Sequence, residues 1–279
     1  MTGESASWIG RTETGRDVLT PGLVQGLLAT LDRDAPYPEP GYEAPQGIHW
    51  LLAQPRVPLS RIGPDGHPER GDFLPPVALP RRMWAASRVD FLAPLRVGDE
   101  IERTSTVAAV TEKEGRSGPL VFVEVDHVTR AGPAPAVAER QTIVYRQAGG
   151  KPAPPRGAPG GDWDWRREVT PDPVLLFRYS ALTFNAHRIH YDLDFATRTE
   201  GYPGLIVHGP LMATLLLDLA ARNLGDNALA GFQFRGVSPA FSGSPLVLLG
   251  RREGAEVVLA AECGDGRPVM TASARIREG

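Results

Sequence analysis

The sequence predicts an α+β protein made of two similar halves, each an antiparallel sheet curled round a helix. Two observations lead to this prediction: a connector near the middle of the 279-residue chain, and short alternating segments on both sides of it. The connector, residues 147–161, reads QAGGKPAPPRGAPGG, a composition that favours an extended, solvated chain over a packed core. We therefore expect one half at residues 1–146 and a second half at residues 162–279.

A similar motif occurs in both halves, where a strand meets a bend. Arg88–Glu100 reads RVDFLAPLRVGDE and Phe234–Pro245 reads FRGVSPAFSGSP, with a Pro and a Gly at matching positions. Short segments with strand-like alternation, separated by turn residues, follow each motif. The segments expected to be strands are Leu120–Arg130, Glu139–Tyr145, Leu246–Leu249, Glu256–Glu262 and Pro268–Ile276.

One helix is predicted to be buried on nearly every side. Pro210–Asn223 reads PLMATLLLDLAARN, which leaves no polar stripe for solvent, so other structure must wrap it. A buried helix followed by a meander of strands is the plan of the hot-dog fold. The first half has no equally apolar long helix: its candidate helices are the amphipathic segment Thr20–Leu31 and the short segment Ile48–Leu52. We therefore predict a double hot-dog whose N-terminal half is degenerate.

Charge and cysteine content exclude several classes of function. The 30 basic and 33 acidic residues are interspersed and give a net charge of -3, which argues against nucleic acid as a partner. Cys263 is the single cysteine, so an intrachain disulfide and a zinc site of several thiolates are both excluded. Residues 1–11 lack a signal-peptide pattern, and no apolar run is long enough to span a membrane. We expect a cytoplasmic protein without a membrane partner.

Three of the six histidines lie close together in the second half. The segment 177–192 reads FRYSALTFNAHRIHYD and places Asn185, His187, Arg188 and His190 in a short polar loop. The pair His208-Gly209 comes immediately before the buried helix. This arrangement indicates a polar loop that faces the N-terminus of a helix.

The loop resembles the Asp-x-Asn-Pro-x-His motif of MaoC-like hydratases and dehydratases, which also have a His-Gly entry to their hot-dog helix. His190 matches the motif's histidine, Asn185 occupies the Asp position and His187 the Asn position. With DVLTPGLV at 17–24 and GPDGHPERGDFLPP at 63–76, nearly the full chain resembles the mesaconyl-C4-CoA hydratase and hydroxyacyl-ACP dehydratase-like group of that superfamily.

The resemblance implies reversible addition of water to an α,β-unsaturated acyl thioester carried by CoA or an acyl carrier protein, without metal or bound redox cofactor. An amide cannot accept a proton as a carboxylate does, so general acid/base duty falls on His190 and Asn185 is left to orient the water. His187 is the candidate for a second acid or for orienting His190. Gly209, at the positive end of the helix, is the candidate oxyanion donor.

Substrate contacts are assigned to Tyr179 and Arg188. Arg188 or Arg178 has two equal interpretations: an ion pair with the acids at 192–194, or a contact to the free carboxylate of a mesaconyl-like substrate. Metal binding by His187 and His190 is argued against, because no further ligand is evident nearby.

Three alternatives remain open from the sequence. The loop at 63–76 is either a structured surface turn or a cover for the acyl pocket, and Arg81 and Arg82 are either solvated or in contact with CoA phosphates. A thioesterase or a non-catalytic acyl-thioester binding protein are the competing functions. We expect a homodimer, with a monomer as the alternative.

Overall fold

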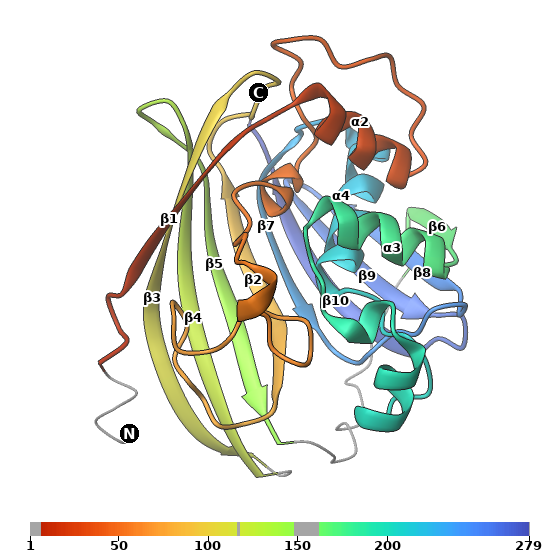
Figure 1. Cartoon of the computed structure of the whole chain (residues 1–279). Coiled ribbons are helices and arrows are strands. Elements are labelled where there is room, and N and C mark those ends of the chain that lie inside the picture. Colours follow the sequence, from red (N-terminus) through yellow and green to blue (C-terminus); the bar gives the residue numbers. More distant parts are fainter. Residues whose placement is uncertain (1–6, 116–117, 148–161, 279) are drawn as a thin grey trace.

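The strands form a single sheet that runs through both halves of the chain (Figure 1). The computed structural model describes residues 7–115, 118–147 and 162–278. Most of the expected connector and part of the turn at 114–119 lie outside these residues. The sheet is antiparallel and has the order β1-β3-β4-β5-β2-β7-β10-β9-β8-β6. The first-half strands are β1 (Thr12–Val18), β2 (Arg81–Phe91), β3 (Glu100–Gly115), β4 (Gly118–Ala131) and β5 (Pro135–Arg146). The second-half strands are β6 (Trp165–Val169), β7 (Leu229–Gly236), β8 (Leu246–Glu253), β9 (Glu256–Cys263) and β10 (Pro268–Ile276).

The strand order is nearly symmetric about the pairing of β2 with β7. Outward from this pair, β5, β4, β3 and β1 on one side correspond to β10, β9, β8 and β6 on the other. The repeated motif found in the sequence begins in β2 and in β7, and its glycines, Gly98 and Gly243, both have positive φ in the following bend. The double hot-dog prediction is confirmed, and the two sheets join edge to edge within one chain.

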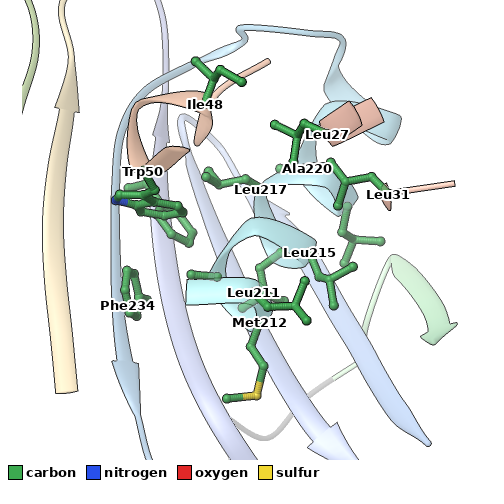
Figure 2. Packing of buried hydrophobic residues seen from close by; sticks show 14 of the residues in the cluster. Leu27, Leu31, Ile48, Trp50, Leu211, Met212, Leu215, Leu217, Ala220 and Phe234 are labelled. Carbon is green, nitrogen blue, oxygen red and sulfur yellow. The ribbon is translucent and has the colours of Figure 1, made fainter. Parts of the chain in front are cut away.

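The predicted buried helix is α4 (Gly209–Leu224), and its middle is enclosed by other structure. In Figure 2 its leucines point towards Leu27 and Leu31 on one side and towards Trp50 on the other. Burying such side chains contributes roughly 1.5–3 kcal/mol each relative to leaving them exposed. The helix therefore holds the core together and has its N-terminus fixed within it.

Two shorter helices occupy matching places after the first strand of each half. The helices α2 (Pro21–Thr30) and α3 (Pro173–Leu182) each begin with Pro at the first position, preceded by a capping side chain, Thr20 or Asp172. The helix α2 agrees with the amphipathic segment predicted at Thr20–Leu31, whereas α3 was not predicted. In the first half, the place of α4 is taken by a single 3₁₀ turn, η1 (Ile48–Leu51), so the predicted degeneracy of that half is a lost central helix.

No helix in the described part of the chain is long and apolar enough to cross a membrane.

Candidate active site

The polar loop of the second half lies between the end of α3 and the start of α4. Phe184 takes a positive φ of 50° directly after α3, which turns the chain, and the N–H of Asn185 then donates to Ser180 O at 2.9 Å. The side-chain oxygen of Asn185 accepts from the backbone N–H of His187 at 2.9 Å. A 3₁₀ turn, η3 (Arg188–His190), follows and places His190 in the interior. The local sequence therefore fixes the loop before any ligand arrives.

Four histidine rings form a continuous row at this loop. His190 and His208 are stacked with ring centroids 3.6 Å apart, and His187 meets His190 edge-on at 5.4 Å. The fourth ring, His67, lies 4.0 Å from His187 and comes from the first half of the chain. The structure thus brings together the three histidines singled out from the sequence and adds one that the sequence analysis did not assign.

The hydrogen bonds of His190 identify the ring nitrogen that is free for chemistry. Nδ1 lies 2.8 Å from the carbonyl oxygen of Ile206, and because a carbonyl only accepts, Nδ1 must carry the proton. Nε2 is therefore unprotonated in the neutral ring, and no other described residue forms a hydrogen bond with it. His190 has the tautomer that a general base requires.

His208 is held differently and has a structural role. It is 1% exposed and directly precedes α4, and its Nε2 lies 2.8 Å from the hydroxyl of Ser180. Tyr179 packs edge-on against it with ring centroids 5.3 Å apart. His208 therefore forms the back of the row of rings and fixes the start of α4 against α3.

The loop at 63–76 crosses from the first half and packs on the catalytic segment. The carbonyl of Asp65 accepts from the N–H of Arg188 at 2.9 Å, and the carbonyl of Pro64 accepts from the Arg188 guanidinium at 3.0 Å. Gly66 has φ +90°, and a Cβ there would lie 1.9 Å from the carbonyl oxygen of Ala186. Only glycine allows this close approach. The loop at 63–76 is therefore structured and packs directly on the catalytic segment, and that it covers an acyl pocket stays a prediction.

This loop also carries a carboxylate to the row of histidines. Asp65 Oδ2 lies 3.0 Å from His67 Nδ1, while Asp65 Oδ1 accepts from the backbone N–H of His67 at 3.0 Å. Burial would raise the pKa of Asp65, but the bonds from His67 and the charges of His67 and His187 together lower it. The carboxylate is therefore ionised at neutral pH and orients His67 with Nε2 as its free acceptor nitrogen.

Burial keeps the imidazoles of the row neutral. It lowers the pKa of His190 to about 4, against the opposing effect of the Ile206 carbonyl. Burial is also the main cause of the lowered pKa values of His67, His187 and His208, to which neighbouring rings or arginines add. Neutral imidazoles can accept protons, so the site contains bases that are available at physiological pH.

Two of the residues assigned to substrate binding have other contacts. Arg188 forms an ion pair with Asp192 at 2.7 Å and its guanidinium lies 4.3 Å over the ring of Phe195, which is the structural alternative considered above. Arg178 reaches the carbonyl of Ala29 at 3.4 Å. Tyr179 is completely buried and its hydroxyl is bonded to Thr214, so its assignment to substrate contact is corrected to a core position behind His208.

Gly209 is the first residue of α4, where backbone N–H groups have no partner within the helix. Pro210 lacks an N–H, which leaves Gly209 as the donor at this point. A Cβ on Gly209 would meet only the carbonyl oxygen of Trp84, at an ordinary contact distance of 3.6 Å. Packing within the protein therefore does not require glycine at position 209, and the role of Gly209 as oxyanion donor stays a prediction.

A possible set of metal ligands exists after all. Asp65, His67 and His187 present ligand atoms that lie within 4.8 Å of one another. The expectation that no further ligand lies near His187 is wrong, because the first half provides Asp65 and His67.

Comparison with solved structures places this fold in a defined class. The chain superposes on a MaoC-like dehydratase from Phytophthora capsici with a TM-score of 0.72 over 97% of both chains, at 17% identity. A Mycobacterium tuberculosis protein described as a double hot-dog fold matches over 96% of both chains with a TM-score of 0.56, at 16% identity. The architecture is therefore that of the MaoC-like double hot-dog proteins.

The sequence identifies the family within that class. Residues 47–242 match the model of hydroxyacyl-thioester dehydratase type 2. The chain is also 43% identical to the mesaconyl-C(4)-CoA hydratase of Chloroflexus aurantiacus over 272 residues, which cover 97% of each chain. The chain belongs to the hydroxyacyl-thioester dehydratase type 2 family, and the family resemblance stated from its motifs is confirmed.

The depressed pKa of His190 predicts a pH-dependent stability. Between the ordinary pKa of 6.5 and about 4, the unfolded chain binds a proton at His190 that the folded chain does not. The free energy of unfolding should therefore fall as the pH falls through this window, by up to about 1.4 kcal/mol per pH unit for this ring. Urea unfolding at pH 7.5 and 5.0 measures the loss, and His190→Gln should lose less than the wild type. An equal loss in both proteins would contradict the assignment.

Proposed function

We propose that the protein catalyses reversible hydration of an α,β-unsaturated acyl thioester with His190 as the general acid/base. The observation that carries this proposal is the fixed tautomer of a buried, neutral His190 beside the N-terminus of α4. The family and the similarity to a mesaconyl-C(4)-CoA hydratase support the same reaction class. The enzyme would be a hydro-lyase.

The reaction can be written with the residues present. Nε2 of His190 takes a proton from water as the water oxygen bonds to the β-carbon, and the C=C electron pair moves onto the thioester oxygen. The N–H of Gly209 and the positive end of α4 stabilise the resulting enolate. The imidazolium of His190 then returns the proton to the α-carbon. Asn185 has its carbonyl held by the backbone, so its amide N–H is the group available to orient the water.

The pair formed by Asp65 and His67 compensates for the missing carboxylate at Asn185. A carboxylate bonded to one imidazole stabilises positive charge that develops on neighbouring rings during proton transfer. Asp65 acts through His67 and His187, which lies between His67 and His190. We infer that Asp65 is a positioning residue and that His67 and His187 extend the site toward the first half.

The carrier, compartment and assembly are further parts of this proposal. We infer that CoA or an acyl carrier protein presents the acyl group and that these side chains act without a metal or a bound redox cofactor. The single cysteine supports a reducing, cytoplasmic location. Because both hot-dog halves pair within one chain, the site is complete in one protomer, and a homodimer would add surface and not catalytic groups.

Mixing the purified protein with enoyl thioesters tests the function directly. We expect loss of enoyl absorbance without release of free thiol. Release of one thiol for each thioester consumed would identify a thioesterase. Binding of the thioester without turnover would identify a non-catalytic binding protein. His190→Ala should lower kcat by about 10²–10⁴-fold with the fold retained in circular dichroism. The exposed neighbour variant Tyr191→Ala serves as the control. Full activity of His190→Ala would overturn the assignment.

Replacing Asp65 by Asn tests the positioning role. The substitution removes the negative charge that raises the pKa of His67 and His187, so the acidic limb of the pH–rate profile should move to lower pH. We expect kcat to fall about 10- to 100-fold at neutral pH. Asp72→Asn, in the same loop with an exposed carboxylate, is the matched control. A loss of activity with an unmoved profile would indicate that Asp65 only stabilises the loop.

Replacing Gly209 by Ala should separate stability from activity. Alanine has room beside Trp84 O and favours the helix by up to about 1 kcal/mol, so thermal stability should be unchanged or higher. The added methyl group would keep the thioester oxygen from the N–H, and kcat should fall by about 10²-fold or more. Melting curves and initial rates on the same preparation give both values. Normal turnover would exclude Gly209 as the oxyanion donor.

A further inference from the structure

An arginine without an acidic partner lies beside the row of histidines. Arg82 is in β2, and it forms no ion pair with any residue of the described chain, whereas its neighbour Arg81 is bonded to Glu200 at 2.9 Å. The positive charge of Arg82 lowers the pKa of both His67 and His187, so it acts on the site from close range. Of the other arginines considered for a substrate anion, Arg188 is paired with Asp192, and Arg178 is exposed and reaches only the carbonyl of Ala29.

The residue directly opposite Arg82 on the neighbouring strand is Tyr145. The register pairs Arg82 of β2 with Tyr145 of β5, so both side chains stand on the same face of the sheet. Tyr145 is completely buried; burial raises the pKa of its hydroxyl, and the charge of Arg82 and a hydrogen bond with Arg82 oppose this rise. The Tyr145 hydroxyl and the Arg82 guanidinium are therefore close enough to bind one anion together, the hydroxyl donating its own proton.

A second arginine makes the surroundings of Tyr145 more positive and more rigid. The guanidinium of Arg70 lies 5.5 Å from the centre of the Tyr145 ring. It is fixed by the backbone carbonyls of Val77, Leu79 and Pro80, each at 2.6 Å. Three of the five N–H donors of Arg70 are therefore used by the backbone, which fixes its guanidinium in place, while Arg82 has no acidic partner.

The same strand leads from Arg82 to the N-terminus of α4. Trp84, two residues along β2, has its carbonyl oxygen 3.6 Å from the position of a Cβ on Gly209. Two strand residues span about 7 Å, and an acyl chain of four carbons spans about 5 Å. A thioester oxygen at Gly209 and a carboxylate at Arg82 are therefore compatible with one short acyl chain passing the histidines.

We propose that Arg82 and the hydroxyl of Tyr145 form a subsite for the free carboxylate of a short dicarboxylic acyl thioester. Arg82 neutralises the carboxylate and donates to it, and the Tyr145 hydroxyl donates a second hydrogen bond. The substrate class is then the monothioester of an unsaturated dicarboxylic acid of four or five carbons. This inference rests on the hydratase function proposed above and assigns its acyl specificity.

A pair of substrates that differ in one carboxylate tests the subsite. Hydration of mesaconyl-CoA and crotonyl-CoA is compared in the wild type, Arg82→Gln and Tyr145→Phe. Arg82→Gln should lower kcat/KM for mesaconyl-CoA about 10- to 100-fold, mainly through KM, and change that for crotonyl-CoA less than threefold. Tyr145→Phe should give a smaller loss, again confined to mesaconyl-CoA. Arg88→Gln, an exposed arginine of the same strand, is the matched control and should change neither.

The outcomes separate the subsite from the function. If Arg82→Gln lowers kcat/KM equally for both substrates, or for neither, the subsite is overturned. Hydration of crotonyl-CoA by the wild type would still support the proposed function in that case. A wild type that hydrates neither thioester would overturn both. If Arg82→Gln does not fold, competition in the wild type replaces it: succinyl-CoA should inhibit at least tenfold better than butyryl-CoA, and equal inhibition would overturn the subsite.

Discussion

The pairing of β2 with β7 is the contact on which the rest of the molecule depends. It joins Ala86–Asp90 to Gly231–Arg235 and so makes one sheet from two halves. Because β2 follows directly after the 63–76 loop, the pairing also fixes where that loop meets the second half. Asp65, His67 and Arg82 reach the catalytic segment only through this geometry. The two halves are therefore coupled by backbone hydrogen bonds that no single side-chain substitution removes.

The asymmetry between the halves explains how the site is composed. The first strands and the short helices α2 and α3 correspond, but the first half has η1 in place of α4. Without a second central helix, the chain between η1 and β2 is free to extend over the other half. It covers a small separate core and presents Asp65 and His67 to His187. Degeneracy of the first half thus allows Asp65 and His67 to reach the site.

Local features could be predicted from the sequence and tertiary ones could not. The all-round apolar pattern identified α4 within one residue at each end, and the motif identified Asn185, His187 and His190. The helix α3 was missed because its segment was treated as one with the polar loop, although Asp172-Pro173 is a capping signal. His67 carried no such signal: Asp65 and His67 lie about 120 residues from His187, and only the β2–β7 pairing brings them together. Arg188 shows the same limit. Whether it pairs with Asp192 or is free to bind a substrate carboxylate depends on where the fold places Asp192, and the sequence alone does not show this.

The charged groups around the row of neutral histidines determine how readily these imidazoles accept a proton. Two of the four imidazoles, His190 and His208, are buried and the other two are partly buried, so they accept a proton only if negative charge is close enough to offset the loss of solvation. Asp65 supplies that charge at one end, whereas Arg70 and Arg82 oppose protonation of His67. An anionic acyl group bound at Arg82 would cancel part of this opposition and raise the proton affinity of the row. Substrate binding and base strength are then linked, because the carboxylate that identifies the substrate also favours the protonated intermediate.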